Sequence, residues 1–309
     1  MTVKGPVRIS KMGTTLVHEH ILVDFVGAEQ SGPHRYNASE VIRVVEPYLK
    51  EARKCGCCTF LECTPAYLGR DPVLLAKLAE LTGLNIVTNT GYYAAGMEKY
   101  LPRHAFSESA DQLAACWLRE WREGIGATGI KPGFIKIGVD AGALSAIARK
   151  LVQAACRTHL QSGLTIAAHT GNGTAALAQL EVLADEGVQG CAFVWVHAQN
   201  EQDSRIHVRA ARAGAWIEFD GIAPQTIDRH IQLVNTMKAH GLLHRVLISQ
   251  DAGWYHVGEP GGGKYRPYTM IFNQFIPALK AAGVTEEEIQ QIMVINPREA
   301  FASRVRRSK

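Results

Sequence analysis

The chain has 309 residues, with 33 Lys and Arg against 29 Asp and Glu and a formal net charge of +4. So mild a positive charge is not typical of a nucleic-acid-binding protein. The length suffices for one α/β barrel or for two smaller domains. Because no linker or low-complexity segment divides the chain, we expect a single domain over residues 1–309.

The segments that would direct the protein to a membrane or an oxidising compartment are not found in the sequence. No basic start followed by an apolar stretch resembles a signal peptide, and no apolar run reaches membrane-spanning length. We therefore expect a cytoplasmic protein without a membrane partner. The seven cysteines show no zinc-type spacing, and their odd number disfavours a full set of disulfides, so free thiols are expected.

Eight apolar runs alternate with amphipathic or alanine-rich stretches along the chain. The expected strands are residues 15–20, 58–64, 85–91, 134–139, 164–170, 192–197, 215–221 and 245–251. The expected helices are residues 40–54, 71–82, 107–124, 144–162, 173–186, 202–213, 225–240 and 268–282. This strict alternation predicts an α/β fold of the (β/α)8 TIM barrel type, with a long loop at about 252–267 after the last strand.

Two histidines separated by one residue, His18 and His20, end the first expected strand. Side chains at positions i and i+2 point to the same face of a strand, so both imidazoles are aimed at one place. Neutral imidazoles are common ligands of divalent metals. The pair by itself is equally typical of a structural histidine pair, and a metal site needs further ligands from elsewhere in the chain.

Polar residues in four other expected strands supply such ligands. His169, His197 and Asp251 each end an apolar run, and Lys136 lies inside one. In a TIM barrel the carboxyl ends of the strands form the active site. We therefore predict that six side chains meet at the barrel mouth: His18, His20, Lys136, His169, His197 and Asp251.

This donor set suits two divalent cations better than one, because a single tetrahedral zinc needs only three protein ligands and a water. A buried ammonium on Lys136 would be repelled by two cations. Addition of carbon dioxide to the neutral amine gives a carbamate that is able to bridge both metals. Two alternatives stay open for Lys136: an ion pair with Glu62 or Asp251, and a Schiff-base lysine. Zinc is the first expectation for the metal, and manganese, cobalt and iron also suit imidazole-rich sites.

These motifs resemble the phosphotriesterase family of the amidohydrolase superfamily, in particular its phosphotriesterase-like lactonase branch. The matching positions are residues 15–20, 135–137 and 169–170, His197, Asp251 and residues 295–297. The resemblance covers nearly the whole chain, from residue 13 to residue 301. It implies that His18, His20 and Asp251 hold the more buried metal and that His169 and His197 hold the more exposed one.

The resemblance further implies a dinuclear metal hydrolase. Carboxylated Lys136 and a hydroxide would bridge the two metals, and Asp251 would receive the proton as the catalytic residue. Because lactonases, phosphotriesterases and other ester or amide hydrolases share this fold, the family does not choose among small-molecule substrates. We expect attack on a lactone or a related carboxylic ester. The alternative enzymatic function is hydrolysis of organophosphate triesters. The alternative that is not enzymatic is a barrel that only binds a metal or another ligand. A homodimer is a possible assembly.

Four residues are candidates for contact with the substrate. The resemblance places Tyr93 against the pocket of the exposed metal. Lys264 and Arg266 lie in the loop after the last strand, whose aromatic and basic residues are typical of a mobile lid and also of an ordinary surface loop. Glu62, at the end of the second expected strand, is a further candidate, and its alternative role is to pair with Arg70 as support for the site.

Overall fold

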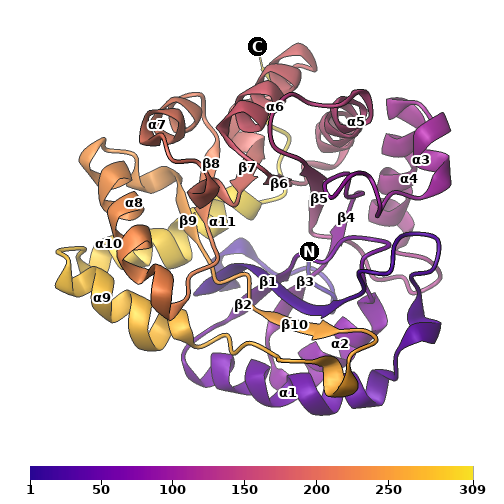
Figure 1. Cartoon of the computed structure of the whole chain (residues 1–309), viewed down its shortest axis with the longest axis horizontal. Coiled ribbons are helices and arrows are strands. Elements are labelled where there is room, and N and C mark those ends of the chain that lie inside the picture. Colours follow the sequence, from indigo (N-terminus) through magenta and orange to yellow (C-terminus); the bar gives the residue numbers. More distant parts are fainter. Residues whose placement is uncertain (309) are drawn as a thin grey trace.

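Parallel strands follow one another around a central ring with helices outside it (Figure 1). The computed structural model describes residues 1–308. Its strands are β1 (Thr15–Val23), β2 (Thr59–Glu62), β3 (Asn85–Val87), β4 (Asn89–Thr90), β5 (Phe134–Val139), β6 (Ile166–Thr170), β7 (Phe193–Val196), β8 (Trp216–Phe219), β9 (Val246–Ile248) and β10 (Gly253–His256). β3 and β4 are two halves of one barrel strand interrupted at Thr88, and β10 extends beyond the ring, so eight strands form the barrel.

The ring continues from the last barrel strand to the first. The backbone N–H of Asp251, just after β9, donates to the carbonyl of His18 in β1 over 3.1 Å. The N–H of His20 in turn donates to the carbonyl of Ala252 over 2.9 Å, and β10 continues this pairing along β1. The predicted (β/α)8 TIM barrel is therefore confirmed.

Helices follow the strands as the sequence predicts. The helices are α1 (Ala38–Lys54), α2 (Pro72–Thr82), α3 (Arg103–Ser107), α4 (Ala110–Glu123), α5 (Ala146–Ser162), α6 (Gly173–Asp185), α7 (Ser204–Arg212), α8 (Ile227–Ala239), α9 (Ile276–Ala281), α10 (Glu286–Gln290) and α11 (Asn296–Phe301). Side-chain oxygens of Asn37, Asp71 and Ser145 cap the first turns of α1, α2 and α5, which is why these helices begin where they do. No helix formed by residues 1–308 combines the length and the apolar composition needed to cross a membrane.

Three features of the fold were not predicted. The first is the presence of the short helices α3, α10 and α11, which are too short to show a long amphipathic pattern in the sequence. The loop after β9 contains the strand β10, which pairs with β1, and is therefore partly ordered by the barrel itself. The pairing of β1 with β2 shifts register between Leu16 and Glu19, a β-bulge of the kind that re-aims side chains next to active sites.

The barrel interior is apolar below the mouth. Phe134 and Ala167 stand two residues before Lys136 and His169, share their faces of β5 and β6, and belong to one buried apolar cluster with Val17, Leu61 and Leu247. This layer excludes water from beneath the polar side chains. The candidate site lies directly above this apolar layer.

Candidate metal centre

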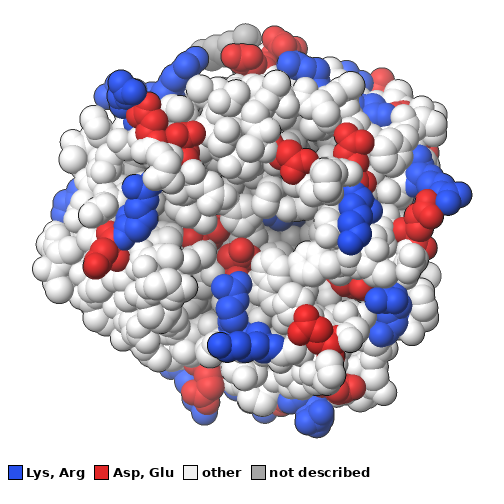
Figure 2. Space-filling model, viewed as in Figure 1, with Lys and Arg blue, Asp and Glu red and all other residues white. Residues whose placement is uncertain are grey.

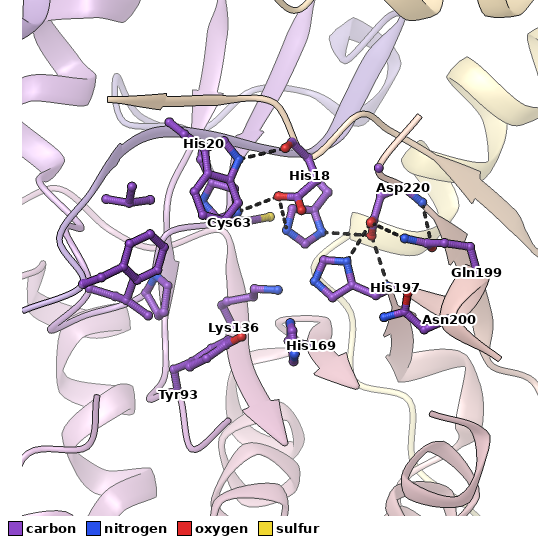
Figure 3. A pocket seen from close by; sticks show the side chains of 17 residues that line it. His18, His20, Cys63, Tyr93, Lys136, His169, His197, Gln199, Asn200 and Asp220 are labelled. Carbon is purple, nitrogen blue, oxygen red and sulfur yellow. Dashed lines mark hydrogen bonds and ion pairs between the residues drawn. The ribbon is translucent and has the colours of Figure 1, made fainter. Parts of the chain in front are cut away.

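All six predicted ligands line one cavity at the carboxyl ends of the barrel strands (Figure 3). The cavity has a volume of about 300 Å³. Figure 2 shows the visible face hollowed near its middle, with acidic and basic side chains interspersed over the rest of that face. Residues separated by as many as 233 positions, from His18 to Asp251, are thus brought together by the barrel topology.

The side chains converge closely. Oδ1 of Asp251 lies 3.1 Å from Nε2 of His20 and 3.8 Å from Nε2 of His18. The ring centres of His18 and His197 are 4.9 Å apart, and those of His169 and His197 are 4.5 Å apart. His18, His20 and Asp251 offer one group of mutually close ligand atoms, which is the set that the resemblance assigns to the buried metal.

In three of the histidines, Nδ1 lies within hydrogen-bond distance of a side-chain oxygen. Nδ1 of His18 lies 2.7 Å from Oε1 of Glu218, and Nδ1 of His197 lies 2.6 Å from Oδ1 of Asp220. Nδ1 of His20 lies 2.8 Å from the hydroxyl of Thr64. These contacts leave Nε2 of His18 and His20 facing Asp251, as in metal sites where a carboxylate or hydroxyl orients each imidazole.

The sequence reasoning missed Glu218, Asp220 and Thr64. A signal for the first two exists, because the run Trp216–Phe219 is otherwise apolar and positions 218 and 220 share a face of their strand. A buried carboxylate on such a face needs a partner. β8 supplies none of the six predicted ligands; Glu218 in β8 and Asp220 just after it instead supply the carboxylates that orient His18 and His197.

Burial sets the charge state of the site. Desolvation lowers the pKa of His18 to about 3 and also lowers the pKa values of His20 and His169, with the charge of Lys136 acting in the same direction. These imidazoles are therefore neutral near pH 7, which is the form that binds metals. Burial opposes ionisation of Asp251, yet the facing His20 and His18 lower its pKa to about 2.

Lys136 is buried in the middle of β5, and only 2% of it is exposed. Its side chain points into the same space as His169 and His197 (Figure 3). Between residues 1 and 308, no ion pair joins Lys136 to Glu62 or Asp251, the pairing that was one alternative for this lysine. Lys136 therefore lies among candidate ligands without an ion-pair partner of its own in the described part of the chain.

Tyr93 is the one predicted substrate contact that lines the cavity. Its ring packs against Gly138 of β5, where a Cβ would collide with it, and lies 5.1 Å from the ring of His169. Phe25 and Trp254 also line the cavity and form an aromatic wall, with ring centres 5.6 Å apart. Sequence reasoning had noted Trp254 only as part of the loop.

The other three predicted contacts lie outside the cavity lining. Lys264 is exposed, and Arg266 donates to the backbone carbonyl of Asp251 while lying over the ring of Trp254. Glu62 is buried and accepts hydrogen bonds from the backbone N–H groups of Ile21 and Thr64 over 3.2 and 3.3 Å. Its alternative partner Arg70 pairs with Glu120 over 2.7 Å.

The burial of Glu62 has a measurable consequence for stability. Desolvation raises its pKa to about 7, and Oε2 has no hydrogen-bond partner among the described residues. A raised pKa in the folded state means that stability is lost as pH rises from the unfolded value through 7. Glu62→Gln removes this cost, so the variant is expected to gain up to about 3 kcal/mol over the unsubstituted chain between pH 5 and pH 8. Urea unfolding of both proteins across this range measures it, and a difference that does not grow with pH would contradict it.

The donor set fits divalent cations. Neutral imidazoles and the half-buried carboxylate of Asp251 surround one cavity, and Oδ1 of Asp251 receives no well-formed hydrogen bond from residues 1–308. A second group of close ligand atoms comes from His18, His197 and Asp220. Histidine and carboxylate ligands of this kind suit zinc and its first-row neighbours.

Comparisons with known proteins agree with this arrangement. The model of the Phosphotriesterase family matches residues 1–301. The chain is 27% identical over 293 residues to the phosphotriesterase homology protein of Escherichia coli (strain K12), covering 94% of this chain and 98% of that protein. It is 28% identical over 310 residues to the aryldialkylphosphatase of Saccharolobus solfataricus, covering 97% of this chain and 98% of that protein.

A solved structure shows the same fold. A mutant of the PTE-like lactonase of Deinococcus radiodurans superposes with a TM-score of 0.88 at 26% sequence identity, covering 98% of this chain and 99% of that one. The family match, the relatives and this structure each extend over nearly the whole length of the chain. The protein therefore belongs to the phosphotriesterase family of hydrolases.

Proposed function

We propose that the protein is a dinuclear metal hydrolase that opens lactones or cleaves related carboxylic esters. The observation that carries the proposal is the convergence of His18, His20 and Asp251 on one point of the cavity, with His169, His197 and Lys136 beside them. Divalent cations at such a site supply Lewis-acid polarisation of the substrate and a nucleophile from water at neutral pH. A barrel that only binds a ligand has no need of so many neutral, open imidazoles.

The ligand assignment that we propose uses all six side chains. His18, His20 and Asp251 hold the more buried cation, and His169 and His197 hold the more exposed one. Lys136, as a carbamate formed with carbon dioxide, is the anionic ligand shared by both. In this form the buried lysine no longer brings a positive charge among the cations, which removes the repulsion that an ammonium would meet.

Asp251 is the group that we propose to take up the proton. Its carboxylate is ionised, since its pKa lies at about 2, and its Oδ1 faces the cavity beside His20. A carboxylate in that position accepts a proton from the attacking water and passes it outward. Neither a serine nor a cysteine nucleophile is required.

Tyr93 is the side chain that we propose to position the lactone by a hydrogen bond. Burial raises the pKa of its phenol, so the hydroxyl keeps its proton and is able to donate a hydrogen bond at the edge of the cavity. A lactone or ester offers acceptor oxygens at its ring or alkoxy side. One similar protein is named an aryldialkylphosphatase and another a PTE-like lactonase, so proteins with names for both activities resemble this chain. The apolar wall of Phe25, Leu68 and Trp254 admits a neutral substrate of either class.

A substrate panel on one preparation of known metal content tests the proposal. The enzyme is expected to turn over at least one lactone faster than any organophosphate triester. Tyr93→Phe is expected to lower kcat/KM for the best lactone by about tenfold, the value of one hydrogen bond, and to change triester turnover less. Lys264→Ala tests the predicted loop contact in the same assay.

The neighbouring Tyr92 provides a matched control. Its hydroxyl lies 3.3 Å from His104 and does not line the cavity, so Tyr92→Phe is expected to leave both activities unchanged. Equal losses on both substrates in Tyr93→Phe would refute its discriminating role. Triester turnover above that of every lactone would replace the proposed class with a phosphotriesterase, and bound metal without any turnover would favour a binding barrel.

A further inference from the structure

Glu19, the middle residue between His18 and His20, points away from the cavity. Alternation along β1 sends the two histidines to one face and Glu19 to the other. The Glu19 side chain is fully buried. A carboxyl group is costly in such a place unless hydrogen bonds hold it.

The hydrogen bonds of Glu19 go to the residues on either side of Asp251. Its Oε1 accepts from the hydroxyl of Ser249 over 2.8 Å and from the backbone N–H of Gln250 over 3.0 Å. Its Oε2 accepts from the backbone N–H of Ala252 over 2.7 Å. The carboxylate thus spans the candidate ligand Asp251 and holds the chain before and after it.

Asp251 adopts a backbone conformation that needs such support. Its φ is +50°, in the left-handed region that residues with a side chain seldom enter. On the other side of the peptide, its carbonyl accepts a hydrogen bond from Nε1 of Trp254 over 2.8 Å and another from Arg266. Its own N–H donates to the carbonyl of His18 over 3.1 Å. Contacts from two sides therefore hold the strained residue over the cavity.

We propose that Glu19 is a positioning residue for Asp251. It ties the strand that carries His18 and His20 to the turn that carries Asp251, and so sets the distances within this group of ligands. Glu19 touches neither the cavity nor a substrate, and it acts only through the backbone on both sides of Asp251. This role rests on the proposed function, in which Asp251 is a metal ligand.

The first test measures Zn²⁺ affinity in Glu19→Gln by competition with a chelating indicator. Glutamine keeps the size of the side chain and one acceptor oxygen, but its NH₂ group then faces the N–H of Ala252, donor against donor. Affinity is expected to fall by about 10- to 100-fold, the range for losing a group that orients a ligand. Ser249→Ala removes one donor to Glu19 and also the hydroxyl that accepts the backbone N–H of His18 over 3.0 Å, so it is expected to weaken Zn²⁺ binding as well.

The control separates positioning from general stability. His159 of α5 is buried and hydrogen-bonded to the backbone of Leu164 and Arg306 over 2.8 and 2.9 Å, outside the cavity lining. His159→Leu is expected to lower Tm while leaving Zn²⁺ affinity unchanged. A loss of affinity in this variant equal to that in Glu19→Gln would overturn the proposal.

A double-mutant cycle shows whether Glu19 acts through Asp251. In an Asp251→Ala background, Glu19→Gln is expected to weaken Zn²⁺ binding by less than about threefold, because the group it positions is gone. An undiminished loss in that background, or unchanged Zn²⁺ affinity in both Glu19→Gln and Ser249→Ala, would overturn the role of Glu19. Failure of the unsubstituted protein to bind any divalent metal would overturn the proposed function and this role with it.

Discussion

A Lys136→Met enzyme is expected to lose most of its bound metal and nearly all of its activity. Methionine fills the same buried space in β5 but offers no amine to carboxylate, so the carbamate that we propose as the shared ligand would be missing. Loss of metal affinity is expected to exceed the roughly 10- to 100-fold that accompanies loss of a group merely supporting a ligand. Metal analysis after dialysis, together with turnover of the best lactone, measures both effects.

The unsubstituted enzyme provides the complementary experiment. After removal of metal with a chelator, added bicarbonate is expected to speed recovery of activity on addition of Zn²⁺, because the proposed carbamate would have to form again. Bicarbonate is expected to have no such effect on Lys136→Met. Full metal content without turnover in Lys136→Met would favour the Schiff-base alternative, and a bare ammonium at Lys136 in a metal-loaded crystal structure would rule out carboxylation.

Asp251→Asn is expected to separate proton transfer from metal binding. The amide oxygen of asparagine remains able to ligate a cation, but the amide does not accept a proton. Turnover is expected to fall by about two to four orders of magnitude, the range for loss of general-base action, while part of the metal is retained. The decrease is expected in kcat rather than in KM, since the proposed role of Asp251 is to act on the attacking water and not on the substrate.

Metal content decides how the Asp251→Asn result is read. Rates are compared per bound metal, so that loss of the cation is not mistaken for loss of the base. A near-unchanged rate per metal would remove Asp251 from the proton transfer. The variant also bears on Glu19, because Glu19 is expected to matter for Zn²⁺ binding only while residue 251 remains a ligand.

Much of the site was predictable because a barrel turns a local pattern into a shared location. Short apolar runs ending in His169, His197 or Asp251 are readable within a few residues, and parallel strands in a TIM barrel all end on one face. The six candidate ligands could therefore be placed together without knowledge of any tertiary contact. Helix starts depend on local caps as well: Asp71 caps α2 at the expected start, whereas α1 begins at Ala38 after its cap Asn37, two residues before the expected start.

The partners of buried polar groups were not predictable, because they depend on contacts between distant segments. Glu62 was expected at the substrate and instead holds backbone N–H groups of Ile21 and Thr64, while Arg70 pairs with Glu120. Likewise, no local pattern connects Glu218 with His18, which lie 200 residues apart.

The sequence by itself determined the alternation that builds the barrel and the residue types at the strand ends, because both are periodic or local properties of the chain. Only the tertiary structure decided how those side chains are held. The bulge between Leu16 and Glu19 arises where β1 pairs with β2, and the left-handed conformation of Asp251 arises where the turn after β9 meets β1. A buried carboxylate takes whichever donors the fold brings to it, and packing rather than neighbouring sequence determines which donors those are.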